Sequence, residues 1–484
     1  MQRRFDRSGG LLLHPTSLPD GRLDRSADDL LAFLRSAGLS WWQMLPIVPA
    51  DSGGSPYRSI SAFAGDPRLF EPSPSLPNTR DGRSGGGPHL HAAGGGSEPR
   101  GSMRSMLPGL TGIHAHPPPA ISDSDEFQRA NRAWLDDFAL FVALKEETSG
   151  AAWTSWPEPL RRRDPAALVE ARRRLAPALE RVVREQAHFD RRWREFKGRC
   201  ERAGVRLMGD VPIFVAHDSA DVWAHPELFR LDPDGRPEVV TGVPPDYFNA
   251  EGQHWGNPHY RWGAPVFAWW IERLGRAFSM FDAVRLDHFL GFLRAWEIPA
   301  TATSAKDGRY VAGPGAAFFD AVTRALPDRR LLAEDLGLQT AESRELRDAF
   351  GLPGMHVLQF SFGDDAFERP HRFAPNSAVY TGTHDNDTAA GWARDPNHAA
   401  EVERMRRYFG GDDGDSHWRM ICGAWATVCD LAIAPAQDLL GLGSEARMNR
   451  PGVATGNWRW RMERGALTPA IADRLRDLTQ LYGR

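Results

Sequence analysis

Cysteine, lysine and long apolar runs are all scarce in this chain. Its 484 residues include three cysteines, Cys200, Cys422 and Cys429, which show neither CxxC spacing nor a pairing pattern. That favours a reducing compartment over a disulfide-stapled secreted fold. No apolar run approaches the ~18 residues of a membrane span. Near the start only residues 11–13 form an apolar run, which is too short for a signal peptide. We therefore expect a cytoplasmic protein.

The charge balance excludes some classes of partner. Only three of the 59 basic residues are lysine, and this bias selects no partner by itself. The net charge of −4 gives no overall attraction to polyanions. We expect neither nucleic acid nor a membrane as partner. The hydrophobic fraction of 41% and charged fraction of 25% are ordinary for a globular protein, and the length suffices for a large enzyme domain with insertions.

Short apolar runs recur along the chain with helical patterns between them. An apolar run bounded by Gly, Pro or His is typical of a buried parallel strand. Alternation of such strands with helices predicts an α/β fold, and eight of them predict a (β/α)₈ TIM barrel. The candidate strands are residues 10–14, 41–47, 205–211, 281–287, 330–335, 354–360, 377–381 and 431–435.

The spacing of these runs predicts inserted substructure. The gaps 47–205 and 211–281 are too long for one helix, and the first contains 3.6-residue periodicity at 134–145 and 182–196. We expect four parts. They are 1–70, the first part of the catalytic barrel; 71–124, a low-complexity and flexible insertion; 125–202, a helical subdomain; and 203–484, the rest of the barrel with a lid loop and an insertion at 212–280.

The stretch 71–124 has too few apolar residues to order itself. Its pairs His89/His91 and His114/His116 have no nearby Cys or carboxylate, so we expect no metal site there. Two origins stay open, a natural flexible insertion and a locally shifted reading frame in a GC-rich gene. Resequencing the coding DNA would separate them.

Acidic residues stand where four of the apolar runs end: Asp210, Asp287, Glu334 and Asp385. Buried charge is costly unless it is paired or lines a cleft. The ends of barrel strands line the active-site face. Several carboxylates around one mouth point to glycoside chemistry, in which one carboxylate is the nucleophile and another the general acid/base.

Neighbouring residues suggest how these carboxylates differ. Arg285 and Asp287 are two apart, so in a strand they share a face, and the arginine favours the ionised carboxylate. A structural ion pair is the alternative. Partial burial of Glu334 near other carboxylates would raise its pKa, as a general acid requires. The alternative for Glu334 is helix capping together with Asp335.

Two further patterns suggest sugar contacts. His384-Asp385-Asn386-Asp387 lacks the Gly and distal Glu of a calcium loop, so a grip on sugar hydroxyls fits better than a metal site. Among 17 tryptophans, Trp255 has Gly on both sides in what reads as a loop. With Tyr247 and Phe248 it resembles a lid over an elongated cleft. A hydrophobic loop anchor is the alternative.

Eight longer segments carry recognisable motifs: residues 14–19, 55–65, 209–223, 242–258, 284–289, 333–337, 381–388 and 437–449. Together they resemble one family, the 4-α-glucanotransferases (amylomaltase or disproportionating enzyme, glycoside hydrolase family 77). The resemblance covers residues 8–70 and about 125–463. It departs at 20–25, at Leu290, at Asp66 and over 71–124, but the acidic residues that match its catalytic positions are intact.

The resemblance implies an α-amylase-related barrel with inserted helical subdomains that transfers α-1,4-glucan segments between maltooligosaccharides with net retention. No metal, nucleotide or organic cofactor is expected. By motif position, Asp287 would be the nucleophile, Glu334 the acid/base and Asp385 a transition-state stabiliser. A retaining pair lies about 5–5.5 Å apart. The implied sugar-binding residues are Asp210, Arg285 and His384 for the donor, and Tyr57, Tyr247, Phe248, Trp255 and Asn257 for the lid and acceptor side.

Two alternatives remain at this point. An α-glucan hydrolase or phosphorylase would use water or phosphate in place of a sugar acceptor. A glucan-binding relative without turnover is the other, suggested by the unusual 71–124 stretch. The presence of Asp287, Glu334 and Asp385 together argues against that second alternative.

Overall fold

The structure is a computed structural model that describes residues 4–50, 54–71, 123–245, 250–337, 340–364, 369–410, 415–453 and 455–484. Residues 72–122 of the predicted flexible insertion (71–124) and the predicted lid residues Tyr247 and Phe248 therefore lie outside the described residues.

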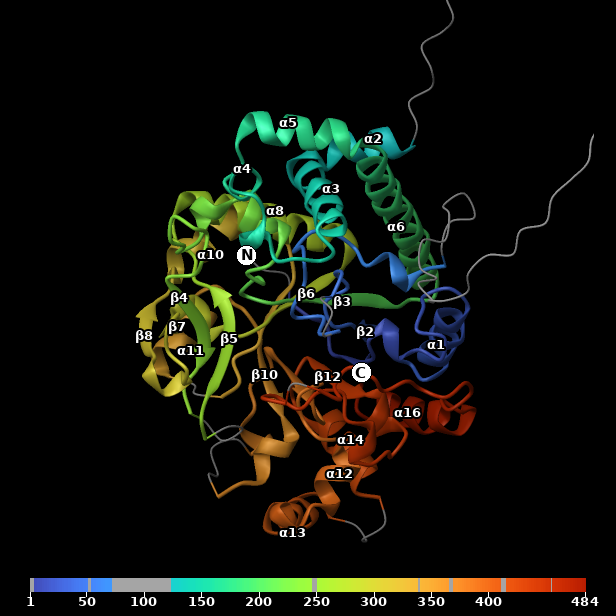
Figure 1. The fold of residues 1–484 in the computed structure, drawn as a ribbon. Coiled ribbons are helices and arrows are strands. Elements are labelled where there is room, and N and C mark those ends of the chain that lie inside the picture. The colour runs from blue at the N-terminus through green and yellow to red at the C-terminus, as the bar shows by residue number, and fades with distance from the viewer. Residues whose placement is uncertain are drawn as a thin grey trace, which may run out of the picture.

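An eight-stranded parallel sheet forms the centre of the molecule (Figure 1). Each strand lies within or overlaps one of the eight runs predicted from the sequence, so the barrel prediction is confirmed. The order around the sheet is β10-β11-β12-β1-β2-β3-β6-β9. The strands are β1 (Ser8–Leu12), β2 (Trp41–Gln43), β3 (Arg206–Val211), β6 (Ala283–Leu286), β9 (Leu331–Ala333), β10 (Gly354–Val357), β11 (Ser377–Tyr380) and β12 (Leu431–Pro435).

The sheet closes between β9 and β10, its two end strands. The Ala333 N–H donates to the Pro353 carbonyl at 2.9 Å, and the Asp335 carboxylate accepts from the Met355 N–H at 2.8 Å. Arg347 holds the other oxygen of Asp335 at 2.5 Å. A Cβ at Gly354 would meet the Arg347 and Asp335 side chains at 2.5 and 2.6 Å, so a larger residue here would displace this ion pair.

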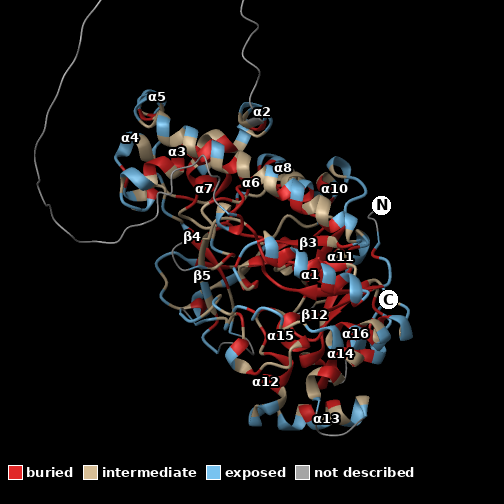
Figure 2. Cartoon of the chain, turned by 90° about the vertical axis from the view of Figure 1, so that its right-hand side faces the viewer, coloured by how far each residue is buried: buried red, intermediate tan, exposed pale blue. Residues whose placement is uncertain are grey.

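Alternating residues of the strands divide the core into an interior and an outer layer. Leu12, Trp41, Met208 and Leu332 belong to one buried cluster, the barrel interior. Their neighbours in sequence belong to a larger cluster that also contains the apolar faces of the helices. Strands buried on both faces are expected of a helix-covered parallel sheet. Figure 2 shows the strands almost wholly buried and the helices exposed on their outward sides.

Amphipathic helices cover the outside of the barrel. In α8, for example, Trp270, Leu274 and Phe278 are buried on the side that packs against it. The first and last helices, α1 and α16, lie against each other. The covering helices are α1 (Arg25–Ser36), α6 (Ala176–Arg202), α8 (Ala264–Met280), α10 (Gly315–Ala325), α11 (Ala341–Ala349), α12 (Ala389–Arg394), α13 (Ala399–Phe409), α14 (Ser416–Ala426) and α16 (Pro469–Leu481).

Between β2 and β3 the chain forms α2 (Asp123–Ala130), α3 (Arg132–Glu147), α4 (Glu158–Arg161) and α5 (Pro165–Arg174) before α6. These helices gather at one end of the molecule (Figure 1). The helical patterns predicted at 134–145 and 182–196 lie inside α3 and α6, so these two predictions are confirmed. Short helices elsewhere are α7 (Ala220–Ala224), α9 (Leu290–Leu293) and α15 (Ala436–Leu439).

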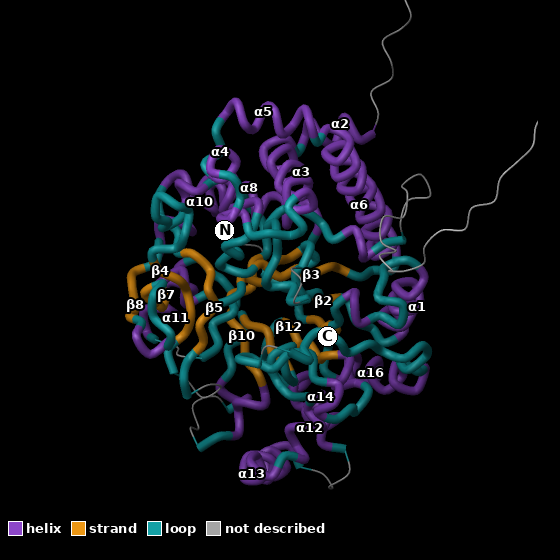
Figure 3. The backbone as a smooth tube through the Cα atoms, in the orientation of Figure 1, coloured by secondary structure: helices purple, strands orange, loops and turns teal. Residues whose placement is uncertain are grey.

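A second sheet, which the sequence did not predict, stands beside the barrel (Figure 3). Its four strands are antiparallel in the order β5-β4-β7-β8. Trp255 lies in β5, so the prediction that it stands in a loop was wrong. The strands are β4 (Val239–Val243), β5 (Gln253–Pro258), β7 (Arg294–Pro299) and β8 (Arg309–Ala312).

None of the helices in the described ranges has the length and apolarity that crossing a bilayer requires.

Candidate active site

The ends of neighbouring barrel strands bring the predicted carboxylates to one mouth. The ladder between β3 and β6 pairs Asp210 with Arg285, and the ladder between β6 and β9 pairs Leu286 with Ala333. One residue further along, Asp287 and Glu334 therefore follow adjacent strands. The Asp287 N–H donates to Val211 O and the Glu334 N–H to Leu286 O, which continues the ladder into both residues.

Arg285 is the central cation of this mouth. Its Nη1 lies 2.8 Å from both oxygens of Asp210 and 2.8 Å from Asp287 Oδ1, and its Nη2 lies 4.0 Å from Glu334 Oε2. Burial opposes the charge on Arg285, but Asp210 and Asp287 raise the pKa of the guanidinium above its usual range. The Asp210 side chain is 0% exposed, whereas that of Asp287 is 26% exposed and open to a reactant.

Glu334 lies in a different environment from Asp287. Burial, together with the negative charge of Asp287, raises the pKa of Glu334 to about 8. The positive charge of Arg285 partly opposes this rise in pKa. Two backbone donors oppose it as well, the His288 N–H at 2.7 Å from Oε2 and the Leu336 N–H at 3.0 Å from Oε1. His288 has φ of 51°, a left-handed conformation that is uncommon outside glycine. The result is a carboxyl group that keeps its proton at neutral pH and is held in position through both oxygens.

Tyr57 joins this group from the loop that follows β2. Its hydroxyl donates to Asp210 Oδ2 at 2.7 Å, and its ring stacks on His384 with centroids 5.0 Å apart. Burial raises the pKa values of both Tyr57 and Asp210. Tyr57 was predicted on the acceptor side, but the structure brings it to Asp210 and His384, the residues expected to contact the donor.

Asp385 follows β11 and is fixed by residues from beyond β12. Asn449 Nδ2 donates to Asp385 Oδ1 at 2.6 Å, and Arg447 Nη2 donates to the Asp385 carbonyl at 2.6 Å. His384 Nε2 lies 3.3 Å from Asp385 Oδ2. The side chain of Asp385 is 38% exposed, so the carboxylate is held by these contacts and is still accessible from solvent.

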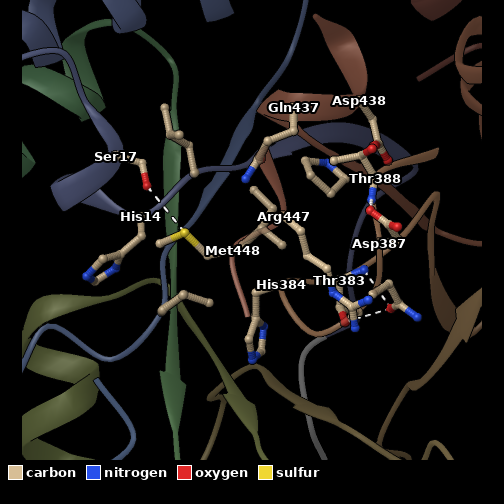
Figure 4. Close-up of a pocket in the computed structure, with 15 residues that line it drawn as sticks. His14, Ser17, Thr383, His384, Asp387, Thr388, Gln437, Asp438, Arg447 and Met448 are labelled. Carbon is tan, nitrogen blue, oxygen red and sulfur yellow. Dashed lines mark hydrogen bonds between the residues drawn. The ribbon is translucent and has the colours of Figure 1, made fainter. Parts of the chain in front are cut away.

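A small cavity of about 30 Å³ lies behind His384 (Figure 4). Its wall includes His14, whose pKa burial and the neighbouring His384 lower to about 3. It also includes Asp438, whose pKa burial raises to about 6, although Thr381 Oγ1 and the Ala389 N–H donate to it. His14 is thus neutral, and Asp438 is held by two hydrogen bonds. This wall of the cavity therefore helps to support the loop that carries Asp385.

Two further predicted residues, Trp255 and Asn257, lie on β5 and make fewer contacts with the group around Arg285. The Trp255 ring meets the His288 ring edge-on with centroids 5.0 Å apart, so β5 reaches the mouth. Asn257 Nδ2 donates to Val215 O at 2.7 Å and so holds the segment that follows β3.

Sequence reasoning missed Asn449 and Arg447 as residues of this site. They stand 64 and 62 residues after Asp385. No local periodicity links such distant positions. The available signal was the segment 437–449, which matched the family pattern without indicating what its asparagine contacts.

Within the described ranges, no group of three or more His, Cys, Asp or Glu side chains is arranged to hold a metal ion.

A parallel barrel with several carboxylates around its mouth is typical of enzymes that act on glycosidic bonds. The sequence pattern of the 4-alpha-glucanotransferase family matches residues 13–468, and the chain belongs to this family. The chain is 44% identical over 505 residues to a 4-alpha-glucanotransferase of Thermus thermophilus, covering 99% of both. It is 38% identical to one of Streptococcus pneumoniae, covering 99% of this chain and 97% of that one. The family resemblance is thereby confirmed.

Solved structures agree with this assignment. The amylomaltase of Streptococcus agalactiae in complex with acarbose matches with a TM-score of 0.85 at 30% identity, over 99% of each chain. An amylomaltase of Corynebacterium glutamicum shares the fold, with a TM-score of 0.71 at 15% identity over 99% of this chain and 75% of that one.

Proposed function

We propose that the protein is a 4-α-glucanotransferase that transfers α-1,4-glucan segments between maltooligosaccharides by a retaining double displacement. The main observation in support of this proposal is that two neighbouring carboxyl groups have different surroundings. Glu334 is buried with its pKa raised to about 8, whereas Asp287 is partly exposed and paired with Arg285. Two carboxyl groups whose environments differ in this way are suited to separate roles of acid and nucleophile.

In the first half-reaction, Asp287 attacks the anomeric carbon of the donor while Glu334 gives its proton to the leaving glycosidic oxygen. A covalent glucosyl-enzyme and a shortened glucan result. In the second half-reaction, Glu334 takes the proton of an acceptor 4-hydroxyl, whose oxygen attacks the anomeric carbon and releases Asp287. Two inversions give retention, for which the two carboxyl groups should lie about 5–5.5 Å apart.

The surrounding residues would orient the donor sugar. Asp385, fixed by Asn449, has a partly exposed carboxylate that would accept from sugar hydroxyls. Asp210, Arg285, Tyr57 and His384 form the wall beside the nucleophile. Transfer also requires that water be excluded from the intermediate. We assign that task, and contacts to the acceptor, to Trp255 and Asn257 of β5 and to Tyr247 and Phe248. We place the reaction in the cytoplasm, consistent with the free thiols of the three cysteines.

Incubation with maltotriose alone tests the reaction class. Glucose together with a ladder of longer maltooligosaccharides, separated by chromatography over time, is the expected result. Glucose and maltose without a ladder would instead identify a hydrolase. No conversion by folded protein, with longer donors also unchanged, would identify a glucan-binding relative without turnover.

Asp287→Ala tests the nucleophile. We expect a loss of at least ~4 kcal/mol of transition-state stabilisation, about a thousandfold in rate. Asp473→Ala, at a 60%-exposed position in α16, should retain normal turnover. An Asp287→Ala enzyme with more than a tenth of normal turnover would contradict the assignment.

Mass spectrometry tests the covalent intermediate. Glu334→Gln, supplied with an α-maltosyl fluoride that needs no protonated leaving group, should accumulate a maltosyl adduct on the peptide that contains Asp287. An adduct on another residue, or none under conditions where fluoride is released, would exclude the double displacement through Asp287.

A further inference from the structure

A third aromatic ring extends the wall formed by Tyr57 and His384. The Trp458 ring centroid lies 5.9 Å from that of Tyr57 and 6.0 Å from that of His384. Tyr57 and His384 are themselves tied to the mouth, through Asp210 and Asp385. Trp458 comes from a distant part of the chain, beyond β12, and is only half-buried.

The backbone of Trp458 is strained to hold this position. Its φ of 63° is left-handed, a conformation that is unfavourable for a non-glycine residue and is a genuine outlier for a bulky side chain. The Trp458 N–H donates to Met448 O at 2.8 Å, and the ring packs against the barrel interior. Strain of this kind persists where the surroundings enforce it, and it concentrates at ligand clamps. The hydrogen bond to Met448 and the contact with the barrel interior hold Trp458 in this position.

Sugar rings present apolar C–H faces that pack on flat aromatic surfaces. A half-buried indole next to Tyr57 and His384 offers such a surface on the side of the mouth that holds the donor. Because the ring is already packed in place, little ordering of this side chain is needed on binding. The partly exposed Asp385 offers a polar group to the hydroxyl edge of a sugar there, but it offers no flat apolar contact.

We propose that Trp458 is a sugar-stacking residue that holds a glucose unit of the donor glucan beside the catalytic carboxylates. The proposal rests on the proposed function for the identity of the ligand as an α-1,4-glucan. Trp458 acts on binding and leaves the bond-making groups unchanged, so its removal affects KM more than kcat.

Two substitutions separate stacking from a purely structural role. Trp458→Asn removes the ring at a backbone conformation that asparagine tolerates, whereas Trp458→Phe keeps a flat ring. For each variant we would measure kcat and KM for maltotriose disproportionation, and the Kd of acarbose by calorimetry. We expect Trp458→Asn to raise KM and Kd about tenfold with kcat within threefold of wild type, and Trp458→Phe to raise them less than threefold.

Tyr408→Asn is the matched control. Tyr408 is 39% exposed and its ring stacks on His371, as Tyr57 does on His384, but it lies on α13. This variant should leave KM and Kd unchanged. If Trp458→Asn does not fold, as judged by circular dichroism, Trp458→Leu keeps the apolar contact with the barrel interior and makes the same comparison.

The proposal is overturned if the ring-free variant binds acarbose and maltotriose within twofold of wild type, or if kcat falls while KM stays constant. It is also overturned if Trp458→Phe weakens binding as much as Trp458→Asn. Failure of the wild type to disproportionate maltotriose would overturn the proposed function instead, and the acarbose comparison would still test Trp458.

Discussion

At the scale of single residues, the proposed role of Glu334 predicts a pH limit on activity. The proposed first half-reaction needs the protonated carboxyl group, and burial, together with the charge of Asp287, raises its pKa to about 8. Activity should therefore be present below this value and fall as pH rises through about 8. The alkaline limb of kcat/KM against pH reports this group in the free enzyme. A flat profile up to pH 10 in a folded sample would show that Glu334 is not the acid.

Asn449 tests whether the orientation of Asp385 matters. Asn449→Ala removes the donor 2.6 Å from Asp385 Oδ1 and leaves the carboxylate free to rotate. We expect kcat/KM to fall about 10- to 100-fold, in keeping with the roughly 1.5–3 kcal/mol of a hydrogen bond to a charged group. Asn397→Ala, whose side chain bonds only the nearby Asp395 among the described residues, should leave kcat/KM within twofold. Equal rates for the two variants would remove Asn449 from the site.

Sequence patterns identified Arg285 and Asp287 as a pair because residues two apart in a strand share a face. They identified Glu334 because burial near other carboxylates raises a carboxyl pKa. They missed the hydrogen bond from Asn449 to Asp385. These two residues lie in loops that follow different strands, and only the closed barrel brings the two loops together.

At the scale of the elements, the closure between β9 and β10 depends on Asp335. This side chain is 5% exposed and holds both Arg347 and the Met355 N–H, whereas Asp348, the other partner of Arg347, is 63% exposed. Asp335→Asn should lower the free energy of unfolding by about 2–4 kcal/mol, because Arg347 loses its buried partner.

Asp348→Asn breaks only the exposed pair and should cost less than about 1 kcal/mol. Urea unfolding of both variants would measure the difference. Similar midpoints for the two would mean that Asp335 does not secure the closure.

The eight barrel strands were predictable because each is short, apolar and bounded by turn-forming residues. The second sheet was not. Strand β5 reads Gln-His-Trp-Gly-Asn-Pro, a composition depleted in strand formers, and β4 pairs with β7 across more than 50 intervening residues. The strands of this second sheet are stabilised by partner strands distant in sequence, so local sequence patterns give little indication that the strands exist.

At the scale of the whole molecule, electrostatics should contribute little to substrate capture. The net charge is −4 and a glucan is neutral, so there is no long-range steering for salt to screen. The ion pairs around Arg285, whose side chain is 4% exposed, are buried and weakly screened. We expect kcat/KM to stay within twofold between about 50 and 500 mM NaCl, where exposed charge interactions are strongly screened. A decline of tenfold would indicate that charges outside the mouth take part in binding.

The influence of Asp287 on Glu334 has a consequence for the order of events. The negative charge of Asp287 is one cause of the raised pKa of Glu334. If Asp287 becomes the glucosyl ester, as we propose, that charge would be lost and the pKa of Glu334 would fall. Glu334 would then remain ionised after giving up its proton, which is the state needed to activate the acceptor hydroxyl. Glycosylation of Asp287 would thus convert its neighbour from acid to base, and transfer of the glucan to the acceptor would restore the acid for the next donor.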